Sequence, residues 1–593
     1  MNSYLENKTK ILTDAAMGRK KANIVIKNTS IINTNTREIV ENMDIGIVED
    51  RICLVGNCHN LIGDDTKIID GTGLFASPGF MDGHIHVESS MVSITEYGKE
   101  VMRRGTTAIF HDPHEIGNVL GTYGIDLMLK EGENIPLKTF CTMPSCVPAV
   151  LDFEEPAHKI ESSTVCEYLK QDNIIGLGEM MDMYGVINNN EHIHEELKGT
   201  LAENKTITGH FTIPTKDNEL NAYIATGINC CHETVTKEDA LKKMRLGMYV
   251  QMREGSAWQD VKELVPLLVE SNIDSRFATL VSDDTHPNTL MENGHMDHIL
   301  RLCVELGLNP VEAIQMCTIN TANCFNIARD YGSIAPGKVA DIVLLRDLKD
   351  FVADYVIING EVVTKGGKIV IDIKKPVFNS KELNTMNISK TFAAEDFIIE
   401  SEVENGEVIA NVINIIEVKA PNYHIKVNMK SENYIVSQDL GRDILKVSCI
   451  DRHNNIDKKA MGFVKGFNIK EGAVASTVAH DTHNINVIGT NDEDMAFAVN
   501  ELIKVGGGVV VVKNCEVIGL VELKLAGLMS VEDIETTSQK VSTVEKGFEI
   551  LGCDIISPFM TMALLSLAVI PELRLTNKGL VDTVKFEFIN LFD

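Results

Sequence analysis

Short apolar runs alternate with longer amphipathic stretches between residues 77 and 330. The amphipathic stretches predict helices, for example Lys237–Leu246 and Met296–Leu306, and the apolar runs predict buried strands. Alternation of strand and helix over about 250 residues is typical of a (β/α)8 barrel, whose active site lies at the C-terminal ends of the strands. The eight predicted strands end near His86, His111, Met143, Glu179, His210, His232, Met252 and Asp283.

The segments on either side of this region have a different character. Residues 1–76 and 331–375 carry short strand-like runs broken by turn residues. The remainder, residues 380–593, mixes predicted strands with predicted helices and is expected to form a separate α+β domain. The fold class is therefore α/β, with a catalytic barrel at residues 77–330.

Composition and charge narrow the class of partner. The chain has 593 residues, of which 44% are hydrophobic and 24% charged, as in globular proteins. The 85 acidic residues outnumber the 55 basic ones, giving a formal net charge of −30. Binding to nucleic acid or to an anionic membrane needs a basic surface, so we expect neither partner. A small, nearly neutral ligand in a local pocket is compatible with this charge.

The chain carries no targeting or disulfide signal. Met1–Lys10 lacks the apolar region of a secretory signal. The longest apolar run, Phe559–Ile570, is too short to span a bilayer and is expected to be a buried core segment. The 13 cysteines are scattered without disulfide-framework or zinc-clip spacing, which indicates reduced thiols and a cytoplasmic location.

Metal-binding residue types stand at five of the predicted strand ends. His84 and His86 are two residues apart on one strand, so both side chains project to the same face. A His-x-His pair alone fits a structural role equally well, and each of the other residues alone fits an incidental polar position. Together they predict two adjacent metal sites. The expected ligands are His84, His86, Glu179, His210, His232 and Asp283.

Two of these residues have distinct expected roles. Two metal ions a few ångströms apart need a bridging group, and the two oxygens of Glu179 suit that role. A metal ion lowers the pKa of its water towards ~7, which supplies a hydroxide nucleophile at neutral pH. Asp283 is expected to ligate one metal, take the proton of the attacking water and pass it to the leaving group.

Further polar residues follow the second and eighth strands. The first set surrounds Pro113 and is expected to bind substrate or to support the ligands, although a polar turn explains it equally well. The second set is expected to orient substrate, or to cap the next helix. The candidate substrate-binding residues are His111, Asp112, His114, Glu115, Asp284 and His286. We interpret His480 and His483 as part of a lid or of a subunit contact. The alternative is that they are ordinary surface histidines.

The sequence resembles the amidohydrolase superfamily and, within it, the bacterial enzymes that deaminate adenine. The resemblance covers nearly the whole chain. It implies that residues 1–76 and 331–375 form one small β-domain beside the barrel. The phrases that carry it are Pro78–Val92, His111–Val119, Gly178–Met181, Arg253–Ser256, Ser282–Pro287 and Ala479–Asn484.

The resemblance implies hydrolytic deamination of adenine to hypoxanthine and ammonia, with two divalent metal ions. It favours Mn(II) or Fe(II), with Zn(II) as a further option, and adenine and water as partners. Ring N1 of the purine needs a proton, for which Glu233 is the candidate; a salt-bridged or helix-capping glutamate is the alternative. A chain of this size is also expected to form a homo-oligomer.

Two loops depart from the family pattern, and other activities stay open. Phe211–Pro214 and Ala149–Ala157 differ from the expected turns, which leaves a related amino-purine as an alternative substrate. An N-acetylglucosamine-6-phosphate deacetylase also fits the barrel, but only Arg253 offers a phosphate grip. Hydantoinases and dihydroorotases carry a carboxylated lysine where this chain has Glu179, so these two activities are weaker alternatives. A non-catalytic metal-binding protein is disfavoured by the complete ligand set.

Overall fold

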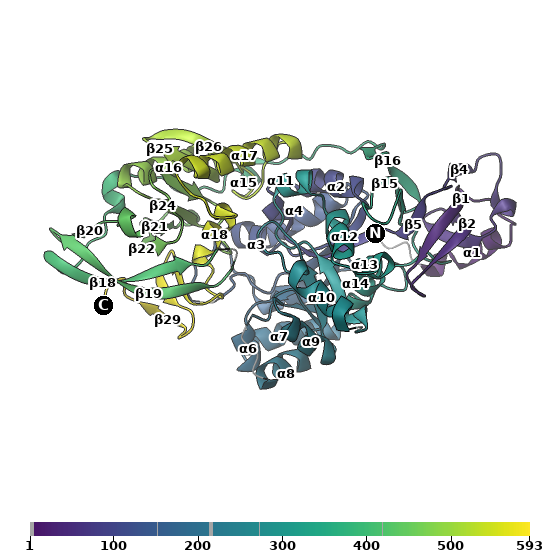
Figure 1. Ribbon diagram of the computed structural model, residues 1–593, viewed down its shortest axis with the longest axis horizontal. Helices are drawn as coiled ribbons and strands as arrows, with labels where there is room; N and C mark the ends of the chain where they lie inside the picture. The colour runs from purple at the N-terminus through teal and green to yellow at the C-terminus, as the bar shows by residue number, and fades with distance from the viewer. Residues whose placement is uncertain (1–4, 151, 213–216, 272, 418) are drawn as a thin grey trace.

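The computed structural model describes residues 5–150, 152–212, 217–271, 273–417 and 419–593. A barrel lies in the middle of the elongated molecule, with a small β-rich unit at one end and the C-terminal α+β region at the other (Figure 1). None of the described helices combines the length and hydrophobicity that crossing a bilayer requires.

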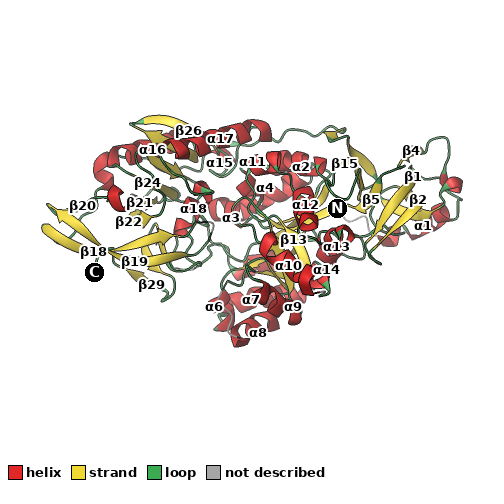
Figure 2. Ribbon diagram, viewed as in Figure 1, coloured by secondary structure: helices red, strands yellow, loops and turns green. Residues whose placement is uncertain are grey.

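The barrel prediction is confirmed. Five parallel strands, β6–β10, and three further parallel strands, β11–β13, form its wall (Figure 2). Backbone bridges from Ile207 to Ile228 and from Ile85 to Asp283 close the two parts into one ring. Each strand ends within two residues of the predicted position. The strands are β6 Phe80–Ile85, β7 Thr106–His111, β8 Lys138–Met143, β9 Ile174–Met180, β10 Thr206–Gly209, β11 Cys230–Cys231, β12 Tyr249–Arg253 and β13 Ala278–Val281.

Helices between and after the strands cover the outside of the barrel. The barrel strands are almost entirely buried on both faces, as is usual in parallel sheets, and this explains their continuous apolar sequence. The helices are α2 Ile94–Arg103, α3 His114–Leu120, α4 Thr122–Gly132, α5 Ser162–Tyr168, α6 Met183–Ile187, α7 Glu191–Ala202, α8 Asp217–Ala225, α9 Lys237–Arg245, α10 Val261–Ser271, α11 Pro287–Glu292, α12 Met296–Glu305, α13 Pro310–Met316 and α14 Ile319–Cys324.

One sheet joins the segments that flank the barrel in sequence. Strand β5 pairs with β1 in parallel and with β14 in antiparallel orientation, so chain from before and after the barrel shares this sheet. A short helix, α1 (Thr9–Ala16), packs beside it. The strands are β1 Ile24–Asn33, β2 Glu38–Val48, β3 Arg51–Gly56, β4 Lys67–Asp70, β5 Phe75–Pro78, β14 Ile342–Leu345, β15 Ala353–Ile358, β16 Glu361–Lys365 and β17 Lys368–Ile369.

The C-terminal region is built on a nine-stranded sheet in the order β20-β19-β18-β22-β21-β24-β23-β25-β26. Helix α16 begins at the capping side chain of Asn491 and ends at Gly506, whose φ of 90° suits glycine. The strands are β18 Asn405–Ile415, β19 Asn422–Glu432, β20 Ile435–Val436, β21 Ile444–Ile450, β22 Lys459–Lys465, β23 Ala473–Ser476, β24 Ile485–Gly489, β25 Gly508–Lys513 and β26 Glu516–Glu522. The remaining elements are α15 Ser380–Leu383, α16 Asp492–Val505, α17 Ile534–Ile550, α18 Pro558–Ala563, β27 Leu573–Thr576, β28 Gly579–Asp582 and β29 Glu587–Ile589.

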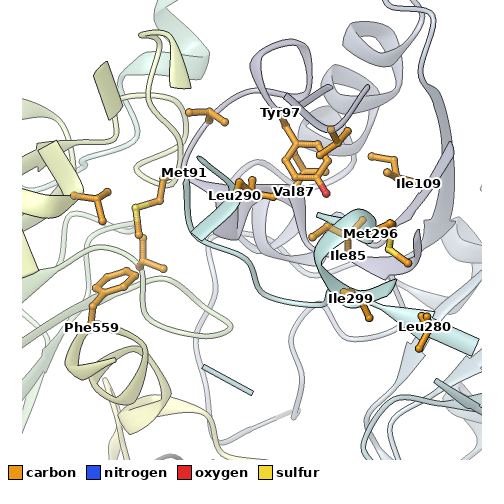
Figure 3. Close-up of a cluster of buried hydrophobic side chains, with 14 of the residues drawn as sticks. Ile85, Val87, Met91, Tyr97, Ile109, Leu280, Leu290, Met296, Ile299 and Phe559 are labelled. Carbon is orange, nitrogen blue, oxygen red and sulfur yellow. The ribbon is translucent and has the colours of Figure 1, made fainter. Parts of the chain in front are cut away.

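The barrel and the C-terminal region share one hydrophobic core. Met91 follows β6 and Phe559 lies in α18, and both belong to the same buried cluster as Tyr97 and Leu290 (Figure 3). The backbone N–H of Ser530 also donates a 2.7 Å hydrogen bond to the carbonyl of Met91. The predicted burial of Phe559–Ile570 is confirmed, because this segment packs over the barrel mouth. The boundaries assigned to the three units stay predictions.

Candidate metal centre and substrate cavity

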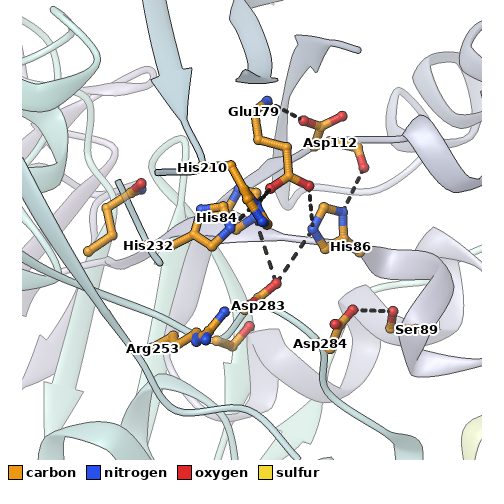
Figure 4. A network of polar contacts seen from close by, with 12 residues as sticks. His84, His86, Ser89, Asp112, Glu179, His210, His232, Arg253, Asp283 and Asp284 are labelled. Carbon is orange, nitrogen blue, oxygen red and sulfur yellow. Dashed lines mark hydrogen bonds and ion pairs between the residues drawn. The ribbon is translucent and has the colours of Figure 1, made fainter. Parts of the chain in front are cut away.

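The six predicted metal ligands converge at the C-terminal ends of the barrel strands (Figure 4). They come from β6, β9 and the residues that directly follow β6, β10, β11 and β13. None is more than 6% exposed. Three overlapping triads each place their donor atoms within 4.8 Å of one another. The triads are His84–His86–Glu179, His84–His232–Asp283 and Glu179–His210–His232.

Glu179 lies between two groups of histidines. Its Oε1 is 3.4 Å from His86 Nε2, whereas its Oε2 is 2.6 Å from His210 Nδ1 and 3.0 Å from His232 Nε2. Burial alone would raise the pKa of Glu179, but the two histidines on Oε2 hold it well below its ordinary value. An ionised carboxylate with one oxygen towards each histidine group is the geometry that a bridging ligand needs.

Asp283 faces the same space from the opposite side of the mouth. Its Oδ1 lies 3.5 Å from His86 Nε2 and 3.7 Å from His84 Nε2. Its backbone has a φ of 57° and donates a 3.0 Å hydrogen bond to the carbonyl of His84. Arg253 Nη1 lies 3.2 Å from the other carboxylate oxygen. The carboxylate is thus held by backbone on one side and by a guanidinium on the other.

Asp112 positions two of the ligands from below. Its carboxylate accepts a 2.8 Å hydrogen bond from the backbone N–H of Glu179, and its carbonyl lies 3.0 Å from His86 Nδ1. A proton on that Nδ1 leaves the His86 Nε2 lone pair facing the centre. A Cβ at Gly178 would lie 2.4 Å from the Asp112 carboxylate, so the close approach requires glycine there.

Glu233 is held in an ion pair with Arg253. Both its oxygens accept hydrogen bonds from that guanidinium, the longer of them 3.1 Å. Burial would raise the pKa of Glu233, but Arg253 and the neighbouring histidines lower it to about 2. Glu233 is therefore ionised near neutral pH and has to take up a proton before it donates one. Its role as the N1 proton donor stays a prediction.

A cavity of about 420 Å³ opens above the ligands. Barrel residues form its floor, and residues after α18 form an apolar roof. The roof residues are Leu564, Leu567 and Ile570, with Ala420, Met181 and Trp258 beside them.

The predicted substrate-binding residues divide into two groups. His114, Glu115 and Asp284 line the cavity, and Asp284 accepts a hydrogen bond from Ser89. His111 and Asp112 are fully buried beneath it and are absent from its lining, so their positions do not support direct substrate contact. His286 also lies elsewhere: its ring packs 5.3 Å from that of Phe559 in a separate pocket. For Asp112 the position fits the alternative role of supporting the ligands, and substrate binding by His111 and His286 stays a prediction.

Sequence reasoning missed the part of the cavity wall that comes from the C-terminal region, and Trp258. His480 and Asp481, in the loop between β23 and β24, line the cavity and are buried rather than on the surface. Trp258 gave no functional signal, yet its ring lies 6.0 Å from the Arg253 guanidinium in the cavity wall. In the sequence, only the segment Ala479–Asn484, which carries part of the family resemblance, pointed to a role for this loop. Of the two unusual loops, Ile213 and Pro214 lie outside the described residues.

The closed barrel with histidines and carboxylates at its mouth defines an amidohydrolase, and residues 75–363 match the model of the Amidohydrolase family. Residues 420–587 match the adenine deaminase C-terminal domain. The chain is 48% identical over 584 residues to an adenine deaminase of Clostridium botulinum, covering 98% of this chain and 97% of that protein. It is 46% identical to the adenine deaminase of Moorella thermoacetica, covering 98% of each. The chain belongs to the adenine deaminase family.

Proposed function

We propose that this protein hydrolyses adenine to hypoxanthine and ammonia at a binuclear metal centre in the barrel mouth. The observation that carries the proposal is Glu179, whose two oxygens face separate histidine groups at the floor of the cavity. The high identity to adenine deaminases over almost the whole chain supports adenine as the substrate.

The ligand residues fit divalent metal ions. His84 Nε2 faces Asp283 at the centre and is buried without a hydrogen-bond partner among the described residues, as expected of a donor reserved for metal. His84, His86 and Asp283 would hold one ion, His210 and His232 the other, with Glu179 between them. When bound, the ions supply a water acidified enough to act as a nucleophile at neutral pH.

We propose Mn(II) or Fe(II) as the working metals, with Zn(II) as the other option. Imidazole suits Zn, Fe and Mn, whereas the two carboxylates favour harder ions.

The charge and cysteine content favour a cytoplasmic protein acting on small molecules, since all 13 cysteines are free thiols. A homo-oligomer is the assembly expected for this chain, and light scattering on the purified protein tests it.

Asp283 moves the proton during the reaction. The water that attacks C6 gives its proton to the Asp283 carboxylate, which lies beside His84 and His86 at the centre. The same carboxyl group then delivers that proton to the departing amino group, which leaves as ammonia. Arg253, 3.2 Å from Asp283, keeps the carboxylate aimed into the cavity.

Removing and restoring the metals tests the proposal directly. Chelation should abolish ammonia release from adenine. Reloading with Mn(II) or Fe(II) should restore that release once the protein holds two ions per chain. The measurement is ammonia production alongside metal analysis of the same sample. Metal-loaded protein that releases no ammonia from adenine would reject the proposed reaction. Release of acetate from N-acetylglucosamine 6-phosphate would support the alternative deacetylase.

Arg574 is expected to stabilise the cavity roof. This buried side chain donates hydrogen bonds to the carbonyls of Leu564, Ile570 and Ala420, all of which belong to cavity residues. Substituting Arg574→Met removes a charge-assisted hydrogen bond from each of these carbonyls, so we expect a loss of about 3 kcal/mol in unfolding free energy and a raised KM for adenine. Urea unfolding and steady-state kinetics measure both. Arg442→Met is the control, because Arg442 pairs with Asp439 on the surface of the same region. Equal effects of the two substitutions would contradict the proposed role.

A further inference from the structure

The cavity has a wall from the C-terminal region that the proposed reaction steps do not use. His480 and Asp481 reach it from the loop between β23 and β24. The backbone N–H of His480 donates a 3.0 Å hydrogen bond to the carbonyl of Ala563 in α18, which ties this loop to the roof. Its ring lies 3.1 Å from the carboxylate of Glu115 on α3, which ties the same loop to the barrel. The loop is therefore fixed from both sides.

Asp481 is a buried carboxyl group with an oxygen available to bind a ligand. The residue is 1% exposed, and its Oδ2 is buried without a hydrogen-bond partner among the described residues. Its Oδ1 lies 3.8 Å from both His114 Nε2 and His480 Nδ1, beyond normal hydrogen-bond length. A buried carboxyl group with an unused oxygen at a cavity wall needs a partner, because leaving it unpaired is costly.

The order of strands around the barrel places Asp481 opposite Glu233, the candidate donor to N1. Glu179 stands on β9. His114, which neighbours Asp481, follows β7, two strands away in one direction. Glu233 follows β11, two strands away in the other direction, and pairs with Arg253 at the end of β12. A flat ligand across the mouth therefore has one edge towards Glu233 and the opposite edge towards Asp481.

Adenine has a matching division between its two edges. N1 and C6 belong to the six-membered ring, and N7 and N9 belong to the imidazole ring. With N1 towards Glu233, the imidazole ring extends towards the wall that carries Asp481. The apolar side chains of Leu564, Leu567 and Ile570 cover the cavity, as a flat aromatic base requires.

We propose that Asp481 hydrogen-bonds the imidazole edge of the purine and selects the free base. This inference rests on the proposed deamination. An ionised carboxylate accepts the imidazole N–H, and a protonated carboxyl donates to the unprotonated nitrogen, so each form recognises this edge. The C-terminal region then forms part of the substrate site, and Asp481 acts in specificity without taking part in proton transfer at C6.

The test compares three bases in the metal-loaded enzyme: adenine, 7-deazaadenine and 9-methyladenine. Asp481→Leu removes the polar group without making room. We expect it to lower kcat/KM for adenine about 10- to 100-fold, mainly through KM, because a hydrogen bond to a charged group is lost. The two analogues should lose less. If the variant no longer prefers adenine over 7-deazaadenine in kcat/KM, N7 is the atom that Asp481 binds. If it no longer prefers adenine over 9-methyladenine, that atom is N9.

A matched control separates recognition from folding. Asp451→Asn alters an equally buried aspartate of the C-terminal region, which bonds the backbone N–H groups of His453 and Asn454 outside the cavity. It should leave all three selectivities unchanged. Asp481→Asn, which retains polar atoms, should recover part of the adenine activity. Unchanged selectivities in Asp481→Leu would overturn the inference. Wild-type enzyme that does not deaminate adenine would instead overturn the proposed function.

Discussion

Replacing Asp283 by asparagine should reduce turnover of adenine by about 10³-fold, within the range assigned to a positioned proton carrier. Asparagine fills the same space and retains an oxygen, but its amide does not take the proton of the attacking water. Its neighbours His84 and His86 stay in place because the backbone bond from residue 283 to the His84 carbonyl is unaffected. The loss should therefore fall on kcat more than on KM.

Metal analysis must accompany that measurement, because Asp283 is also a predicted ligand. A variant that keeps both ions yet turns over slowly isolates the proton-transfer role. Asp297→Asn is the matched control: Asp297 is 5% exposed, lies on α12 and pairs with Arg301 away from the cavity. If Asp283→Asn retains turnover within tenfold of the wild type, the assigned role is wrong.

The second large effect is expected at Glu179. Glu179→Gln replaces an ionised carboxylate by a neutral amide between two groups of histidines. We expect at least one ion per chain to be lost, with metal affinity falling by more than 10²-fold. Mutating a residue that only supports a metal ligand already lowers metal affinity 10- to 100-fold. Ammonia release should then be undetectable, and adding excess Mn(II) should restore only a fraction of it.

Glu196→Gln provides the control for this change. Glu196 is 1% exposed on α7 but lies outside the cavity, and burial holds its pKa well above the ordinary value. Because Glu196 lies away from the metal centre, a neutral amide of the same shape should leave metal content unchanged. A Glu179→Gln enzyme that binds two ions with wild-type affinity would exclude a bridging role.

Local sequence pattern was sufficient to predict the barrel and to single out the six candidate ligands that the structure brings together at its mouth. Five of the eight predicted strand ends carry the expected ligands, and the periodicity of short buried strands and amphipathic helices sets their spacing. Glu179 and Asp283 are therefore recognisable as candidate ligands from the amino-acid sequence alone. The alternation of β6–β13 with helices leaves few other ways to bring those strand ends together.

The cavity wall was beyond that kind of reasoning. Asp481 and Leu564 meet the barrel through contacts that span hundreds of residues, and no local periodicity records such pairings. His111 and His286 show the converse limit. Their positions after barrel strands suggested a facing loop, but whether such a side chain points into the cavity or into the fold depends on packing against segments such as α18. The pairing of Glu233 with Arg253 likewise depends on the distance between β11 and β12 side chains.

The division of the site between barrel and roof has a consequence for how the metals enter. All six donors lie at or before Asp283, whereas the roof begins near Leu564, roughly 280 residues later. At about 5–20 residues per second, a ribosome needs about 15–60 s to make the intervening chain. A nascent barrel therefore exposes its donors to the metal ions of the cell throughout that interval. If the barrel folds in that interval, we expect metal supply as well as metal affinity to decide which ion fills the centre.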